Sequence, residues 1–337
     1  MKSARSAAPE ESMTARKILA LCAMAASAAT SAPSPAQLQS FPSRPLRVIV
    51  PFPSGGSADD VMRILSSRLA QLTGQNVILD NRPGASGNVG TDLAARATAD
   101  GHTLLATTLP LVVNPSLFTH LNHDVLRDFA PVSLVAMAPF VLVVHPSLPA
   151  SSVKELIAYA RVRPGELNYA SAGSGTNLYV AAELFKYLAR LDIVHVPYKG
   201  GGPAMAAMLG GETHISFIEV LAAASYSKAG RIRVLGVTGL KRSPALAGVP
   251  TIAESGLPGY EFTSWYGVLV PRATAHEKVV ALNGHFRNAL RAPEMAERFA
   301  WIGAEIVAST PEEFGRFLRV ELAKWATVVK EAGLKAD

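Results

Sequence analysis

Short apolar runs alternate with amphipathic stretches along most of this chain. The run "PLRVIV" (45–50) predicts a strand, and apolar positions recur at helical spacing over 58–73. "NVILDN" (76–81) and "HTLLATT" (102–108) predict two further strands, separated by a small-residue helix over 87–100. Strands that alternate with helices are typical of a parallel sheet covered by helices.

The same plan returns in the second half of the chain. Two apolar runs in succession, "APVSLVAM" and "FVLVVHP", lead to a helix over 152–165 with Ser151 or Ser152 as its cap. "ELNYASAGSGT" and "DIVHVPYKGGG" are then predicted strands that end in glycine turns and open helices. "HISFIEV" and "RIRVLGVTG" predict more strands, and a capping box of Thr310 and Glu313 starts the last helix.

The length of the chain predicts the number of domains, and its first residues predict an export signal. The chain has 337 residues, of which 49% are hydrophobic, so it can bury a sizeable core, and about two domains are expected. Arg16 and Lys17 precede the apolar run "ILALCAMAASAATSA", which is typical of an export signal over 1–32. Residues 1–12 are either a longer n-region or precede a true start at Met13, and the mature chain should begin within about 27–36. The alternatives are a buried helix or a lipoprotein signal at Cys22, although Leu21 is unsuited to the latter.

Net charge and cysteine content limit the classes of ligand and the chemistry that are expected of this chain. The net charge is +6, but it is scattered without a basic run, which argues against nucleic acid and mildly favours an anionic ligand. Cys22 is the single cysteine, so a processed chain would have neither a disulfide nor a catalytic thiol.

The common catalytic and cofactor motifs are missing. The sequence contains no G-x-x-x-x-G-K-[ST] loop and no G-x-S-x-G elbow, and "GASGNVG" and "GSGTNL" are weak matches to a dinucleotide fingerprint. The eight histidines lack metal-ligand spacing, and no carboxylate pair stands out. We therefore expect neither an enzyme nor a cofactor or metal.

Glycine turns at helix starts are the remaining chemical feature. Gly55–Gly56, Gly173 with Gly175, and Gly200–Gly201–Gly202 each open or precede a predicted helix. A helix N-terminus offers free N–H groups and a positive dipole end, which suits a carboxylate without any lysine. The alternative is that these glycines only make tight turns. Asp59 or Asp60 would cap the first helix or interact with its dipole, and we interpret Asp59 as a turn organiser.

Several long motifs resemble the substrate-binding proteins of tripartite tricarboxylate transporters, the Bug-type receptors. They include "VIVPFPSGGSADD", "NRPGASGNVGTDLAARATADGHTLLATT", "NYASAGSGT", "HVPYKGGGPAM" and "KRSPALAGVPTIAESGLPGYEF", and the likeness covers nearly all of 42–334. The resemblance implies an α/β, two-domain periplasmic-binding-protein fold, type II-like, with a hinge and an interdomain ligand cleft. The domains would be 43–136 plus 262–337 and 137–261, after a linker at 33–42.

The resemblance also implies a set of ligand-binding residues. The set comprises Pro53, Ser54, Gly55, Gly56, Ser57, Asp59, Thr107, Thr108, Asn114, Ser171, Ala172, Gly173, Gly175, Thr176, Asn177, Tyr198, Gly200, Gly201 and Glu219. This chain departs from the family pattern at Ser54, where many members have proline, and at Asn177, where many have histidine. It also has Ile218 and Glu219 where many members have Asp, which argues against an amino-acid ligand.

By this resemblance the chain is a monomeric periplasmic receptor. It would capture a small organic acid and deliver it to one large multi-span and one small four-span membrane subunit. The alternatives are a periplasmic sensor that feeds a signalling system and an enzyme on the same scaffold.

Overall fold

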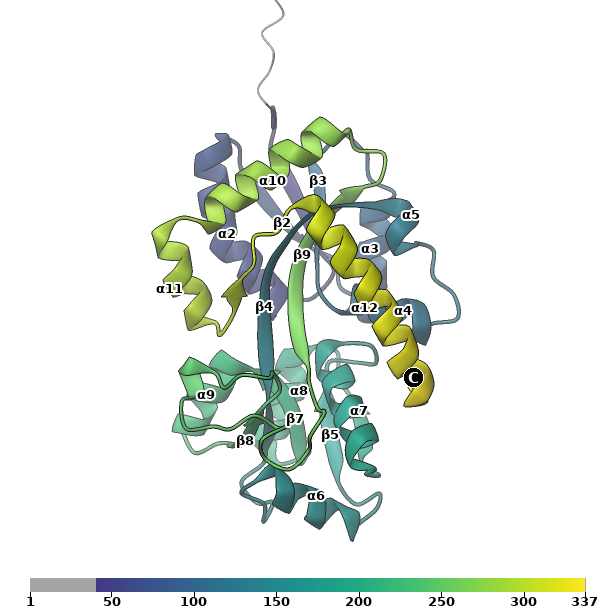
Figure 1. Cartoon of the computed structure of the whole chain (residues 1–337), viewed down its shortest axis with the longest axis vertical. Helices are drawn as coiled ribbons and strands as arrows, with labels where there is room; N and C mark the ends of the chain where they lie inside the picture. The colour runs from purple at the N-terminus through teal and green to yellow at the C-terminus, as the bar shows by residue number, and fades with distance from the viewer. Residues whose placement is uncertain (1–40, 337) are drawn as a thin grey trace, which may run out of the picture. The chain divides into compact units, whose positions relative to one another are not determined.

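The computed structural model describes residues 41–336 (Figure 1). The strands are β1 (Leu46–Val50), β2 (Val77–Asn81), β3 (Thr103–Thr107), β4 (Phe129–Val144), β5 (Asn168–Ser171), β6 (Val194–Pro197), β7 (Ile215–Glu219), β8 (Arg233–Val237), β9 (Thr263–Pro271) and β10 (Glu305–Ile306). The expected export signal, the Met13 start and most of the linker at 33–42 lie outside the described residues.

Helices pack around these strands. They are α2 (Ser57–Thr73), α3 (Asn88–Ala95), α4 (Pro110–Leu117), α5 (Val125–Asp128), α6 (Val153–Arg161), α7 (Asn177–Ala189), α8 (Gly201–Gly210), α9 (Val220–Lys228), α10 (His276–Leu290), α11 (Pro293–Trp301) and α12 (Pro311–Glu331). Two 3-10 turns are η2 (Ala85–Gly87) and η3 (Pro244–Leu246). Within residues 41–336, no helix combines the length and the apolar character needed to cross a membrane.

The strands join in the order β2-β1-β3-β9-β4-β7-β5-β6, with β8 and β10 also paired to β4. β1, β2 and β3 are mutually parallel, as are β5, β6 and β7, whereas β4 and β9 are antiparallel to each other. We call the half that contains β1–β3 lobe 1 and the half that contains β5–β8 lobe 2. The parallel sheets expected from the sequence are present, and the antiparallel strands β4 and β9 are added between them.

β4 is the element that the two lobes share (Figure 1). Its first half pairs with β9 up to Pro139, and its second half pairs with β7 from Phe140 onward. The two apolar runs of the sequence therefore form one strand of 16 residues rather than two separate strands.

The caps of α6 and α12 follow the sequence, whereas the cap of α2 expected from Asp59 or Asp60 is absent, because Gly56 is the N-cap residue and the Asp59 carboxylate bonds to Gly55 before the helix. The Ser152 hydroxyl accepts the N–H of Glu155 at the start of α6. Thr310 and Glu313 form the complete capping box at the start of α12, as expected. The apolar face of α12 is buried through Phe314, Leu318 and Trp325, which packs the helix against the sheet.

Candidate functional site

The turn between β1 and α2 is organised by the carboxylate of Asp59. Its Oδ2 accepts the N–H of Gly55 at 2.9 Å and Nε of Arg63 at 2.6 Å, and its Oδ1 accepts Nδ2 of Asn81 at 3.0 Å. Burial raises the pKa of Asp59, but the hydrogen bonds from Arg63, Gly55 and Asn81 outweigh this and leave the pKa below its ordinary value. Asp59 is fully buried, and its carboxylate serves the turn itself.

The first turn of α2 keeps its backbone donors free of any side-chain cap. Gly56 is the N-cap residue, with an extended backbone at φ −91°, and no side chain bonds to this helix end. The hydroxyl of Ser57 is instead hydrogen bonded to Glu219 and to Tyr266. Pro53, Ser54 and Gly55 are exposed beside this helix end, so a small anion can approach it.

The second glycine turn, at the start of α7, is held by hydroxyl groups. Oγ of Ser171 accepts the N–H of Gly173 at 3.0 Å and lies 2.6 Å from Nε2 of His195. The Thr176 hydroxyl donates to the Gly173 carbonyl at 2.6 Å. Ser171 is fully buried, so the Ser171–His195 pair positions the turn and offers no exposed nucleophile. α7 also begins without a side-chain cap at Thr176.

The third glycine turn begins α8. Gly200 is its N-cap residue, with φ 117°, and no side chain caps the helix. The N–H of Tyr198 donates to the Ser171 carbonyl at 2.9 Å, which ties this turn to the previous one. The Tyr198 hydroxyl is hydrogen bonded to Glu212, and burial followed by that carboxylate raises the pKa of Tyr198. Gly201 is exposed as the first residue of α8, and Ala172 is half-buried against the core.

The structure brings the turns of the two lobes together. The Ser86 hydroxyl of lobe 1 donates to the Ser174 carbonyl of lobe 2. Nδ2 of Asn177 donates to Oγ1 of Thr108 at 3.3 Å, and Thr108 in turn lies 3.0 Å from the Ser264 hydroxyl. The first bond joins η2 to the turn before α7, and the second joins the start of α7 to the residue that follows β3 and, through Ser264, to β9.

Residues of lobe 1 also pack closely against two glycines of lobe 2. A Cβ at Gly200 would lie 3.3 Å from Cγ of Pro53. A Cβ at Gly175 would lie 2.4 Å from Oδ1 of Asn114. Each pair has one member in each lobe, and glycine is what permits the close approach.

Two amide oxygens at this boundary are buried without a hydrogen-bond partner in the described part of the chain. Nδ2 of Asn114 donates to the Ser86 carbonyl at 3.1 Å and to Oδ1 of Asn88 at 2.9 Å, but its own Oδ1 accepts nothing. Oδ1 of Asn177 is likewise unpaired. Buried acceptors usually have a donor, so both atoms can take one from water or from a ligand.

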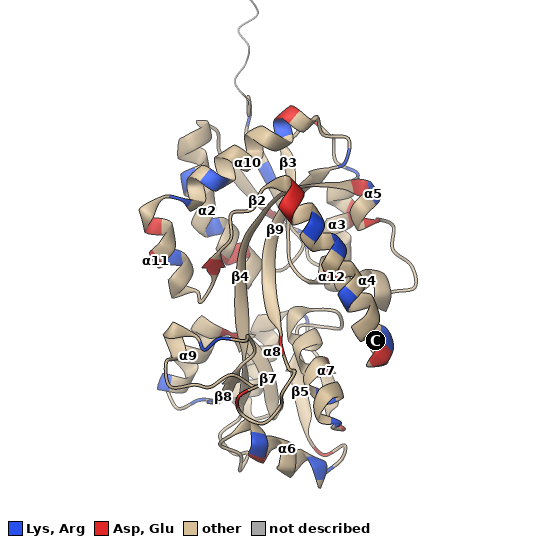
Figure 2. Cartoon of the chain, viewed as in Figure 1, with Lys and Arg blue, Asp and Glu red and all other residues tan. Residues whose placement is uncertain are grey.

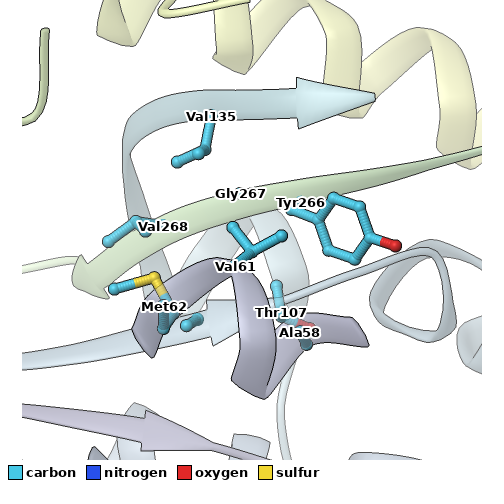
Figure 3. A pocket seen from close by; sticks show the side chains of 9 residues that line it. Ala58, Val61, Met62, Thr107, Val135, Tyr266, Gly267 and Val268 are labelled. Carbon is cyan, nitrogen blue, oxygen red and sulfur yellow. The ribbon is translucent and has the colours of Figure 1, made fainter. Parts of the chain in front are cut away.

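Thr107 faces the interior of lobe 1. With Ala58, Val61, Met62 and Tyr266 it lines a cavity of about 10 Å³ beneath the first turn of α2 (Figure 3). That volume is close to the space that one water molecule needs. Thr107 therefore supports the floor of the site, whereas the adjacent Thr108 bonds across the lobes.

Two acidic side chains, one from each lobe, act on each other across this boundary. Burial raises the pKa of Glu219, and the charge of Asp60 adds to the effect, while hydrogen bonds from its own backbone and from Ser57 oppose it. Burial and the neighbouring Asp59 charge also raise the pKa of Asp60. Figure 2 shows Lys and Arg mainly on the outer helices, with the crossing strands β4 and β9 largely uncharged.

Several residues of this site escaped the sequence reasoning. His195, Ser86 and Ser264 hold the turns or join the lobes, and Tyr266 and Asp60 adjoin Glu219. His195 lies within the quoted motif "HVPYKGGGPAM", which was a usable signal. Ser86 and Asp60 also lie within quoted motifs, whereas Ser264 and Tyr266 lie outside them and act through residues far away in the chain.

Comparison with known proteins gives one consistent family. The tripartite tricarboxylate transporter family receptor (TctC) matches residues 61–334. BugT of Bordetella pertussis is 38% identical over 304 residues, which cover 90% of this chain and 93% of BugT.

Two solved structures agree with this match. An R. palustris protein solved with adipate has a TM-score of 0.84 and 38% identity, covering 87% of this chain and 99% of that one. The periplasmic binding protein BugD has a TM-score of 0.82 and 30% identity, covering 88% of this chain and all of its own (100%). The chain therefore belongs to the tripartite tricarboxylate transporter receptor family and has the two-domain α/β fold of periplasmic binding proteins.

Proposed function

We propose that this chain is a periplasmic receptor that captures a small organic acid between its two lobes and delivers it to a membrane transporter. The observation that carries the proposal is the meeting of three glycine turns, each at an uncapped helix N-terminus, at one boundary. Such helix ends bind carboxylates through backbone N–H groups. The adipate bound by a 38% identical relative supports this class of ligand.

In this proposal each lobe holds one end of the ligand. The N–H groups at the start of α2 take one carboxylate, and those at the starts of α7 and α8 take the other end. The Gly55 N–H is excluded because it already donates to Asp59. The Thr176 hydroxyl is also committed, since its proton goes to Gly173, so the second lobe relies mainly on backbone donors.

We also propose that the lobes open and close around β4 and β9. Lobe 1 would comprise 43–136 and 262–337, and lobe 2 would comprise 137–261, with the two strands as the connection. Bound ligand would favour the closed arrangement because it contacts both lobes only there. Small-angle scattering with and without adipate tests this, and an unchanged radius of gyration on saturation would contradict it.

Membership of the family supports the proposed delivery to a membrane transporter. The closed receptor would dock on a large multi-span subunit and a small four-span subunit, as a monomer exported by a cleaved signal. N-terminal sequencing of the periplasmic protein should find a start within about 27–36. A lipidated Cys22 or an uncleaved Met1 would contradict the export part of the proposal alone.

The ligand class is tested by thermal unfolding with adipate, succinate, malate, citrate and benzoate. A ligand at about 100 times its Kd stabilises the fold by about 2.7 kcal/mol, which raises Tm by several degrees. Isothermal titration then gives the affinity of each acid that shifts Tm. If no carboxylate stabilises the fold while uncharged or cationic solutes do, the proposal is wrong.

A further inference from the structure

A carboxylate of lobe 1 acts electrostatically on a carboxylate of lobe 2 at the boundary between the lobes. Asp60 is in the first turn of α2, and Glu219 is the last residue of β7 and the N-cap of α9. Ser57 and Asp60 are three residues apart in α2, so their side chains share one face of the helix. Because the Ser57 hydroxyl is hydrogen bonded to Glu219, the face that carries Asp60 is turned toward Glu219.

The groups around this pair supply little positive charge. From α2, Asp60 acts on Glu219, and Arg63 is bonded to Asp59 at 2.6 Å. From β9, the Tyr266 hydroxyl adjoins the same point and is neutral at physiological pH. β4 and the loop at Gly303 also pack here, opposite Glu219 and Val220, and contribute Phe140 and a glycine, neither of which titrates.

An anionic ligand would add negative charge beside Asp60 and Glu219. This step rests on the proposed function. Besides Asp59, which is paired with Arg63, a carboxylate at the start of α2 would be the third acidic group, with Asp60 and Glu219, in a space that the closed lobes would shield from water. Three negative charges there repel one another strongly, because screening by solvent is reduced. A neutral carboxylic acid, by contrast, can donate a short hydrogen bond to a carboxylate.

We propose that Glu219 carries a proton when the lobes are closed and donates it in a hydrogen bond to the ligand, so that capture of the organic acid takes up one proton from solvent. Its half-buried position at the lobe boundary supports this assignment, whereas the hydrogen bond from Ser57 opposes protonation without cancelling the effect of burial. The raised pKa of Glu219, caused by burial and then by Asp60, acts in the same direction. Glu219 is thereby a specificity-determining residue that selects anionic ligands.

The first experiment titrates adipate into the full mature chain between pH 5.5 and 8. Wild-type affinity should fall by up to about tenfold per pH unit as Glu219 loses its proton. Glu219→Gln keeps a donor of similar shape, so it should bind adipate at pH 8 at least as well as wild type and with little pH dependence. Glu166→Gln, which changes an exposed glutamate of lobe 2, should retain the wild-type slope.

The outcome that overturns the inference is a Glu219→Gln variant whose affinity follows the wild-type pH profile. A wild-type affinity that does not change between pH 5.5 and 8 would overturn it equally. Titration in two buffers of different ionisation enthalpy gives the number of protons taken up directly, and a value of zero contradicts the proposal.

A second experiment needs no ligand and separates this inference from the proposed function. An acid with a raised pKa stabilises the fold fully below its unfolded pKa, about 4.5 for Glu219, and loses that contribution as pH rises through the folded pKa. The Tm of wild type should therefore fall relative to Glu219→Gln above pH 4.5, while Glu166→Gln stays parallel to wild type. If no acid binds, the proposed function fails; if the Tm difference is constant with pH, the inference fails.

Discussion

The N–H of Gly55 donates to Oδ2 of Asp59 over 2.9 Å, so the turn before α2 contains its own carboxylate. This bond fixes the turn from inside and leaves the N–H groups at the start of α2 to face outward. The first carboxylate at this helix end thus belongs to the protein, and the helix dipole is partly satisfied before any ligand arrives.

Replacing Asp59 with Asn should loosen the turn. The amide has only one acceptor oxygen for the bonds that Gly55, Arg63 and Asn81 now make. We expect a loss of about 2 kcal/mol at pH 7, measured by chemical denaturation. Because the pKa of Asp59 is lowered in the folded state, the stability that its carboxylate contributes is present above pH 3.8. That contribution is lost as pH falls through the folded-state pKa. A difference between Asp59→Asn and wild type that grows on acidification would contradict this account.

Gly55 and Gly56 should respond differently to a methyl group. Gly55 has φ +77° with open space around it, so Gly55→Ala should cost about 1–2 kcal/mol of stability through backbone strain alone. Gly56 has φ −91°, and a Cβ there would lie 3.5 Å from the Pro53 carbonyl, so Gly56→Ala should fold normally. It should still weaken adipate binding, because the methyl group crowds the helix end. Isothermal titration that finds wild-type affinity in Gly56→Ala would remove this helix end from the ligand site.

The Asn177–Thr108 bond should favour the closed lobes. Thr108→Val keeps the shape of the side chain and removes the acceptor for Nδ2 of Asn177. We expect adipate affinity to fall by about 1 kcal/mol, or roughly fivefold. Thr91→Val is the control, because it removes a buried bond to Gly87 within lobe 1. Equal affinity losses in the two variants would show that the bond between the lobes has no special part in closure.

Lys199 should matter little, although it adjoins the third glycine turn. Its side chain is exposed, and recognition is assigned to backbone donors. Lys199→Ala should change adipate affinity by less than about 0.5 kcal/mol in isothermal titration at moderate salt. Abolished binding in this variant would mean that a side-chain cation holds the anion.

Gly267 should tolerate no side chain. A Cβ on this residue of β9 would lie 2.2 Å from Cζ of Phe314, a fully buried ring of α12. Gly267→Ala should cost about 1–3 kcal/mol in denaturant unfolding, whereas exposed Gly248→Ala should be close to neutral. Phe314→Leu should relieve part of the clash. A double variant whose loss equals the sum of the two single losses would disprove direct contact as the cause.

Much of the fold follows from local patterns, and its long-range pairing does not. The capping box of Thr310 and the cap of α6 are local, so the sequence predicts both. Whether "APVSLVAM" and "FVLVVHP" form one strand or two depends on β9 and β7, which come much later in the chain. Both alternatives bury the same apolar residues, so periodicity cannot separate them.

For the candidate site too, the sequence predicts the local features and not the long-range contacts. Glycines before helices identify the three turns, and the resemblance adds residues of both lobes. The sequence does not show that Gly55 rather than Gly56 has the left-handed backbone, nor that Asp59 takes the Gly55 N–H. The proximity of Asp60 and Glu219 is also beyond local pattern, because it exists only once two separate sheets are assembled.

The long strand β4 also decides what can be removed from this protein. It supplies paired edges to both sheets, and one continuous apolar cluster extends from Leu105 through Phe140 to Trp325. A gene fragment for either lobe would lack half of that strand's partners and would expose the shared cluster to water. We therefore expect that neither lobe folds by itself, and heat should melt both in a single cooperative transition.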